Sequence, residues 1–172
     1  YTSVDVAKLV AKLEAEKCQG IILDLRRNGG GSLEECVKLT GMFIKDGPIV
    51  QVNGAGGHQV TDDPDPAVRY DGPLVVLTSR FSASASEILA GALQDYDRSL
   101  VVGETTFGKA LVQSVYRVSG GAGLALTTAR YYTPSGRLIQ RPWDGTFDEY
   151  LTYSLKDQSE RAHTPDQLKY TT

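Results

Sequence analysis

The sequence predicts one α/β domain with a mainly parallel sheet, followed by a β-hairpin near the C-terminus. Over the first hundred residues, strand-like apolar runs alternate with apolar residues at helical spacing. From Leu111 onward the apolar residues instead recur at every second position. A length of 172 residues suits a single hydrophobic core, and 41% hydrophobic residues is typical of a soluble globular domain.

Helices and strands alternate in the first part of the chain. Residues at helical spacing, such as Val6, Val10 and Leu13, predict amphipathic helices over residues 6–13, 33–44 and 84–96. Short apolar runs bounded by glycine or proline predict strands, at residues 21–25, 49–52, 73–77 and 100–102. Because helices separate these strands, we expect the strands to run parallel in one sheet.

The remaining segments have other patterns. Residues 53–70 are rich in glycine, proline and aspartate and predict a loop or a short hairpin that could act as a flap. Alternation over residues 111–118 and 123–132, with glycines between them, predicts an antiparallel hairpin. We therefore expect a core at residues 1–150 and a polar, partly disordered tail at residues 151–172. Since the chain starts at Tyr1 without a Met, we expect it to be part of a longer protein.

Composition argues against several functional classes. A net charge of −3 without a cluster of basic residues argues against nucleic-acid binding. The sequence has no apolar run of about 18 residues, so no membrane-spanning helix is expected. Cys18 and Cys36 have no Cys-x-x-Cys partner or nearby histidine, so we expect free thiols rather than a disulfide, and no metal site.

Three loops follow strands of the predicted parallel sheet, at residues 26–32, 78–84 and 103–109. They carry a run of glycines, a run of serines and a Gly-Lys pair. Because sites in parallel sheets form at the carboxyl ends of the strands, these loops are expected to meet at one functional site.

Ser84 is the candidate nucleophile in this site, but Ser84-x-x-Glu87 is also the pattern of a helix capping box. A nucleophilic serine needs a base, and Lys109 is favoured because it follows a neighbouring strand. A triad of Ser84, His58 and Asp24 is the less favoured alternative, since neither histidine of the chain follows a predicted strand.

A site with a serine nucleophile and a lysine base has two chemical requirements. A lysine base must be neutral, and at a pKa of ~10.4 only about one lysine in 2,500 is neutral at pH 7. We therefore expect Phe107, Ala110 and Leu111 to provide apolar surroundings. Backbone N–H groups must also stabilise an oxyanion, and the N–H of Ala85 and one N–H from residues 29–31 are the candidates.

Residues 103–110 also match a phosphate-binding loop, except that Ala110 stands where Ser or Thr binds Mg²⁺. Such a loop must open a helix, whereas the residues after Lys109 alternate as a strand does. A nucleotide site is therefore disfavoured.

Four motifs together resemble the carboxyl-terminal processing, or tail-specific, serine proteases. The resemblance covers residues 5–142, and its motifs lie at residues 22–31, 82–88, 102–113 and 132–140. It implies a crotonase/ClpP-like fold and a Ser–Lys dyad, with Ser84 as nucleophile and Lys109 as base. It also implies that Gln113 orients the lysine amine, and that Ala85 and Gly30 supply the oxyanion N–H groups. Alternation would place Lys109 and Gln113 on the same face of a strand.

The resemblance further implies an endopeptidase that cleaves proteins near their C-termini through an acyl-enzyme. It implies a protein or peptide substrate, a PDZ domain in the same full-length chain, no cofactor and an exported location, in the periplasm, the cell envelope or a plastid lumen. A homo-oligomer is compatible with it. The chain departs from the family in having Gly29 where proline is usual and Ala110 where glycine is usual. The alternative is a non-catalytic module on the same fold that binds a ligand or peptide.

Overall fold

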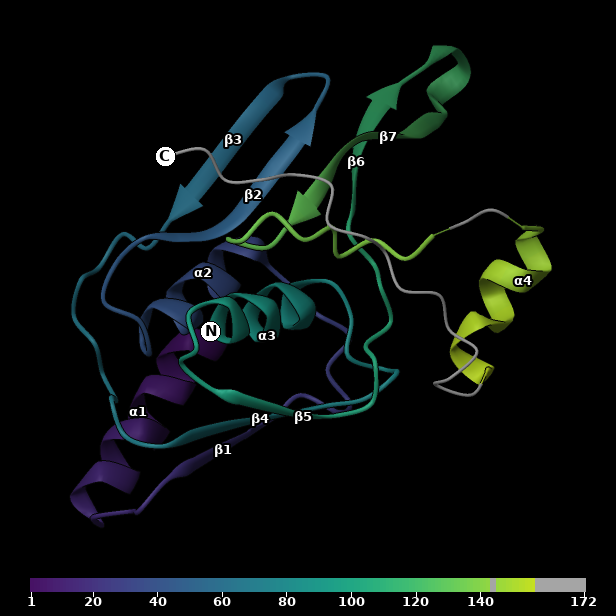
Figure 1. The fold of residues 1–172 in the computed structure, drawn as a ribbon. Helices are drawn as coiled ribbons and strands as arrows, with labels where there is room; N and C mark the ends of the chain where they lie inside the picture. The colour runs from purple at the N-terminus through teal and green to yellow at the C-terminus, as the bar shows by residue number, and fades with distance from the viewer. Residues whose placement is uncertain (143–144, 157–172) are drawn as a thin grey trace.

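Two sheets and three principal helices make up the fold (Figure 1). The computed structural model describes residues 1–142 and 145–156. The helices are α1 (Thr2–Ala15), α2 (Leu33–Gly41), α3 (Ala85–Asp95) and α4 (Phe147–Thr152), with 3-10 turns η1 (Ser119–Gly121) and η2 (Tyr153–Leu155). The strands are β1 (Ile21–Asp24), β2 (Pro48–Gly54), β3 (Gly57–Asp62), β4 (Leu74–Thr78), β5 (Leu100–Gly103), β6 (Leu111–Arg117) and β7 (Gly123–Tyr132).

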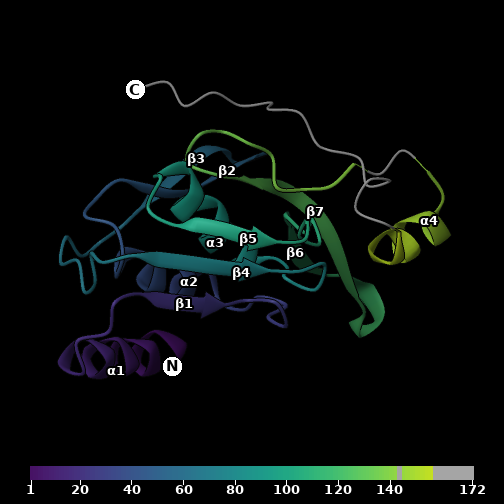
Figure 2. The same cartoon turned by 60° about the horizontal axis from the view of Figure 1, so that its bottom comes forward.

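One sheet is parallel and has the strand order β1-β4-β5. Helices α2 and α3 lie between this sheet and β2, and α1 packs against α2 (Figure 1). The opposite face of the sheet comes forward in Figure 2, where no described element covers it. Ile22, Leu100 and Val102 are exposed on the strands of this sheet, with 67%, 66% and 43% of their surface accessible.

The second sheet is antiparallel, with the order β3-β2-β7-β6. Of the four strands predicted to form one parallel sheet, β1, β4 and β5 do so and β2 does not, so the prediction of a mainly parallel sheet is confirmed only in part. Strand β2 turns directly into β3 through a tight connection, and its other edge pairs with the long strand β7. A two-residue connection forces antiparallel pairing. The hairpin of residues 111–132 is confirmed, and residues 53–70 contain a short hairpin followed by a loop.

The hydrophobic core fills the space between the parallel sheet, α2, α3 and β2. Its largest fully buried side chains include Phe43, Ile49, Ile88 and Leu93. The periodic residues of α3 form its centre, because α3 is buried along most of its length. The packing of α3 therefore fixes the position of its first turn, where Ser84 lies.

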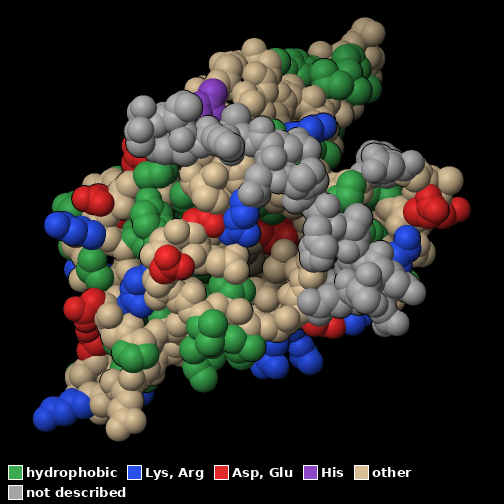
Figure 3. Space-filling model, viewed as in Figure 1, with side chains coloured by type: hydrophobic (Ala, Val, Ile, Leu, Met, Phe, Trp, Pro, Cys, Tyr) green, Lys and Arg blue, Asp and Glu red, His purple; other side chains and the backbone are tan. Residues whose placement is uncertain are grey.

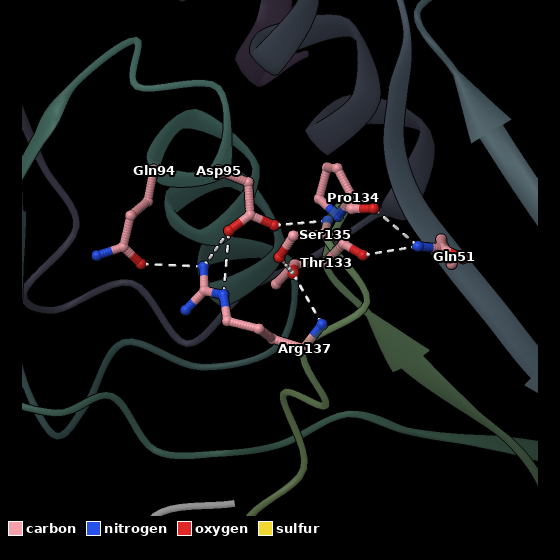
Figure 4. A network of polar contacts seen from close by, with 7 residues as sticks. All are labelled: Gln51, Gln94, Asp95, Thr133, Pro134, Ser135 and Arg137. Carbon is pink, nitrogen blue, oxygen red and sulfur yellow. Dashed lines mark hydrogen bonds and ion pairs between the residues drawn. The ribbon is translucent and has the colours of Figure 1, made fainter. Parts of the chain in front are cut away.

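A polar network attaches the segment after β7 to the end of α3 (Figure 4). Gln51, which is fully buried, donates to the carbonyl oxygens of Thr133 (3.1 Å) and Pro134 (2.9 Å). Asp95 accepts from the Ser135 N–H (2.8 Å) and pairs with the Arg137 guanidinium. Burial opposes ionisation of Asp95, but these contacts and the Thr133 hydroxyl lower its pKa below 3.8.

Replacing Asp95 with Asn is expected to lower the free energy of unfolding by about 1–3 kcal/mol at pH 7, because the charge-assisted bonds are lost. A lowered pKa gives stability that is present above the ordinary value of 3.8 and is lost as the pH falls through the lowered pKa. The difference between the variant and the wild type should therefore shrink near pH 3. Urea unfolding at the two pH values measures this, with exposed Asp97→Asn as the control, and an equal loss at both values would contradict it.

The end of the described chain has regular structure. Residues 147–155, which span the expected boundary at residue 150 between core and polar tail, contain α4 and η2. Thr146 and Glu149 form a capping box that begins α4, with the Thr146 N–H 2.6 Å from Glu149 Oε2. Of the polar, partly disordered tail expected at residues 151–172, residues 157–172 lie outside the described residues.

Acidic and basic side chains are intermixed on the face drawn in Figure 3, without a broad area of one sign. Among the described residues, no helix has the length and apolar character needed to cross a membrane.

Candidate active site

Ser84 stands at a sharp turn between the loop after β4 and the first turn of α3. Its backbone has φ 58° and ψ −119°, a conformation that a non-glycine residue rarely adopts. Its side chain is half-buried, and its N–H donates to Glu87 Oε2 at 2.8 Å. Within the part of the chain that the structure describes, the next N–H, that of Ala85, has no hydrogen-bond acceptor. At the start of α3, a serine with a positive φ is therefore followed by the Ala85 N–H, which is available to donate a hydrogen bond to a ligand atom.

The loops after β1 and β4 are held together by hydrogen bonds. The Ser82 hydroxyl, fully buried, donates to the Leu25 carbonyl oxygen at 2.7 Å. The Ser79 hydroxyl donates to the carbonyl oxygen of Arg26, and the Ala83 N–H donates to that of Asn28 at 3.1 Å. Two of the three loops that the sequence analysis singled out thus meet, and the first serine of the run is structural.

Gly30 touches the turn that carries Ser84. A Cβ atom at Gly30 would lie 2.6 Å from Ala83 O, 2.7 Å from Ser84 Cβ and 2.9 Å from Ala85 N, and its φ is +97°. A Cβ at Gly29 or Gly31 would meet nothing within 4 Å. The Gly30 N–H, the expected oxyanion donor, donates here to Asn28 Oδ1 at 2.9 Å. Glycine is therefore required at position 30 because the glycine loop lies so close to the Ser84 turn. The Gly30 N–H already has Asn28 Oδ1 as its acceptor.

Replacing Gly30 with Ala is expected to lower kcat/KM at least about tenfold, because the methyl group would displace the turn at Ser84 and Ala85. Gly29→Ala is the matched control, since the same methyl group enters open space one residue away. Steady-state cleavage of a peptide substrate compares the two variants. Equal activities would show that the close approach is irrelevant to catalysis.

Glu87 joins the Ser84 turn to the third loop. Its side chain, with 4% of its surface exposed, accepts from the backbone N–H groups of Ser84 (2.8 Å), Gly108 (2.5 Å) and Lys109 (2.8 Å). Burial raises the pKa of its carboxyl group, and a hydrogen bond from the Thr106 hydroxyl and the three N–H bonds oppose that rise. The sequence identifies Glu87 only as part of a capping box with Ser84. The other donors to Glu87, the N–H groups of Gly108 and Lys109, lie 21 and 22 residues further along the chain.

The backbones of Ser84 and Lys109 are linked through Glu87, which accepts from both N–H groups. Their side chains form no hydrogen bond with each other in the described residues. Lys109 is exposed, so the apolar surroundings expected for a neutral lysine are absent. The backbone neighbours, in contrast, are firmly held: Ala110 is 1% exposed and its N–H donates to Gln140 Oε1 at 2.8 Å.

Gln113 is exposed on β6, beyond a register shift between Val112 and Gln113. Lys109 precedes the strand, which begins at Leu111. The alternation of β6 therefore neither starts at Lys109 nor runs unbroken to Gln113, and a shared face for the two side chains stays a prediction.

The rival sites lack their required geometry. His58 lies on β3 and its Nε2 is 2.7 Å from Gln51 Oε1. Asp24 is paired with Arg26, whose hydrogen bonds lower the pKa of its carboxyl group to about 2. The structure thus places neither residue against Ser84. Lys109 is followed by a strand rather than a helix, which a phosphate-binding loop would need.

The cysteines are free, as the sequence analysis expected. Cys36 is buried behind the Ser84 turn, and its Sγ donates to the Ala85 carbonyl oxygen at 3.1 Å. Burial raises the pKa of its thiol to about 12, which disfavours the thiolate that a nucleophilic cysteine requires.

A pocket with apolar and polar walls adjoins the glycine loop. Its volume is about 270 Å³, and its lining includes Gly30, Leu39, Ala85 and Leu89 together with Asp24 and Glu35. The candidate oxyanion groups thus border a space large enough for an apolar side chain.

Comparison with known proteins identifies the family. The sequence profile of "Peptidase family S41" matches residues 1–146. The chain belongs to peptidase family S41. Among S41 relatives, a tail-specific protease of Haemophilus influenzae is 53% identical over 110 residues, which are 63% of this chain and 16% of that protein. A carboxyl-terminal-processing protease of Synechocystis sp. is 45% identical over 137 residues, which are 80% of this chain and 32% of that protein.

A solved S41 structure agrees with the fold. The photosystem II D1 C-terminal processing protease superimposes with a TM-score of 0.76 and 39% identity, over 81% of this chain and 36% of that one. The mixed α/β architecture, with its parallel and antiparallel sheets, is therefore similar to that part of the processing protease. The chain spans 16% and 32% of the lengths of the two curated relatives.

Proposed function

We propose that this S41 chain is the core of a serine endopeptidase that cleaves proteins near their C-termini. Ser84 is the nucleophile, Lys109 the general base and Gln113 the residue that orients the lysine amine. The observation that carries the proposal is the Glu87 carboxylate, which accepts from the N–H groups of both Ser84 and Lys109. This contact gathers the two proposed catalytic residues at the start of one helix.

The reaction proceeds through two acyl transfers. Neutral Lys109 takes the proton of the Ser84 hydroxyl while Oγ attacks the scissile carbonyl carbon. The resulting oxyanion accepts from the Ala85 N–H and from the glycine loop, and collapse of the intermediate expels the amine, which receives the proton from Lys109. Lys109 then deprotonates the water that attacks the acyl-enzyme. The second tetrahedral intermediate expels Ser84 Oγ, which takes that proton back from Lys109, and the new C-terminal carboxylic acid leaves.

Two adjustments accompany activity. The Gly30 N–H must leave Asn28 Oδ1, or share its hydrogen, to reach the oxyanion. Lys109, exposed in this chain, must be covered, because water stabilises the charged form of a lysine. We infer that bound substrate and further chain cover it, as a PDZ domain in the same full-length protein would do. An exported location is part of the same proposal.

The exposure of Lys109 is the observation that favours the alternative, a non-catalytic module that binds peptides on the same fold. A fluorophosphonate probe applied to the full-length protein separates the two. We expect the probe to label Ser84 and the label to disappear in Ser84→Ala. Ser86→Ala, which alters a buried serine two residues away, is the matched control and should retain labelling. A wild-type protein that takes no label would favour the binding module.

A further inference from the structure

Arg141 is a buried cation held by aromatic rings. Only 4% of its surface is exposed, and its guanidinium carbon lies 4.2 Å, 4.1 Å and 4.5 Å from the ring centroids of Phe107, Tyr150 and Tyr153. We call these three rings the Arg141 cage. Nη2 donates to the Tyr150 carbonyl oxygen at 2.6 Å, while Nε and Nη1 are buried without a hydrogen-bond partner. Among the described residues, no carboxylate forms an ion pair with Arg141.

Burying the Arg141 guanidinium in this way lowers the free energy of unfolding. A buried cation without a carboxylate loses its hydration, and each ring returns only about 0.5–2 kcal/mol. An apolar side chain would fill the same space without that loss. The planar guanidinium, however, can stack on several rings at once, and so it can connect segments that carry those rings.

The cage connects the C-terminal segment to the loop that carries Lys109. Tyr150 comes from α4 and Tyr153 from η2, whereas Phe107 lies two residues before Lys109. The backbone repeats this connection, because the Arg141 N–H donates to the Gly108 carbonyl oxygen at 3.0 Å. A Cβ at Gly108 would lie 2.6 Å from Arg141 Cβ, so the two segments are in close contact.

The residues on both sides of Lys109 are therefore fixed by residues 140 and 141. Gln140 holds the Ala110 N–H and Arg141 holds the Gly108 carbonyl oxygen. Glu87 holds the N–H groups of Gly108 and Lys109 from the other side. Residues 108–110 therefore have little conformational freedom as long as residues 140 and 141 stay packed against them.

We propose that Arg141 is a positioning residue, which uses the Arg141 cage to dock α4 and η2 on the Phe107–Gly108 backbone and so sets the position of Lys109. This rests on the proposed function, in which Lys109 is the base. Arg141 acts through Lys109 and touches no substrate. Loss of the cage would loosen the base without altering the nucleophile or the glycine loop.

Kinetics of the full-length protein test this assignment. In Arg141→Met, kcat should fall about tenfold or more with KM within threefold of the wild type, since the base and not substrate binding is affected. The rate of fluorophosphonate labelling at Ser84 should fall by the same factor. Arg141→Lys keeps the charge in the cage and should recover part of kcat. Arg117→Met, which removes an exposed arginine from β6, is the matched control and should behave as wild type.

A second variant covers the case in which Arg141→Met does not fold. Tyr153→Leu removes one ring of the cage from η2, away from the backbone of the Lys109 loop, and should lower kcat in the same direction by a smaller factor. Unchanged kcat in a folded Arg141→Met, with cleavage abolished in Ser84→Ala and Lys109→Ala, would overturn the role of Arg141 alone. Full activity in Ser84→Ala would instead overturn the proposed function.

Discussion

Ser84→Ala and Lys109→Ala should each abolish peptide cleavage by the full-length protein, with kcat reduced by at least about 10³-fold. Without the hydroxyl no acyl-enzyme can form, and without the amine no group takes the hydroxyl proton. The two losses should not add in the double variant, because nucleophile and base act in the same step. Cleavage of a peptide with a quenched fluorophore, followed at substrate concentrations around KM, measures all three variants.

The matched controls are Ser86→Ala in the same helix turn and Lys8→Ala on α1. Both should retain wild-type kcat, and all variants should keep the wild-type unfolding midpoint within a few degrees. Substantial cleavage by Ser84→Ala, or by Lys109→Ala, would remove the Ser–Lys mechanism.

Glu87→Ala should damage stability and activity together. It leaves the N–H groups of Ser84, Gly108 and Lys109 without their acceptor. The Gly108 bond is buried and the other two are partly buried, and each orphaned buried group costs about 1–3 kcal/mol. We expect the free energy of unfolding to fall by about 3 kcal/mol or more. We expect kcat to fall about 10²-fold at a temperature where the variant is still folded, because the Lys109 loop is released from α3.

Glu87→Gln refines this result. Its amide offers one acceptor oxygen and directs two donors toward the same N–H groups, so it should rescue the loss only partly. Glu34→Ala, which removes an exposed acidic residue paired with Lys38, is the control. Urea unfolding and peptide cleavage are measured on the same samples. If Glu87→Ala kept wild-type kcat, Glu87 would be no more than a helix cap.

Local patterns predicted most elements, because helical spacing and apolar runs reflect which side of an element is buried. Strand β2 was predicted, but its partner was not: an apolar run such as Ile49–Val52 does not reveal whether β4 or β7 pairs with it. The choice depends on the β2–β3 turn and on the length of β7. Helix α4 was missed because a helix of one and a half turns has too few positions to show a period.

In the candidate site, too, local patterns revealed some residues, whereas others depended on the tertiary fold. Ser84, Lys109 and the glycine run at residues 29–31 could be singled out, since each follows a strand and carries a distinctive residue type. The choice of Gly30 within that run rested on the family resemblance alone. The dual role of Glu87 could not, because its partners at Gly108 and Lys109 depend on how two distant loops meet. The Arg141 cage could not be foreseen either, since Phe107 and Tyr153 become neighbours only through the tertiary fold.

The backbone at Ser84, with its φ of 58°, has an energetic consequence. A side chain in such a conformation costs about 1–3 kcal/mol, and glycine at the same position would avoid most of that cost. The turn with serine is therefore less stable than the same turn with glycine would be, a balance that is common where a strained residue serves a site rather than the fold.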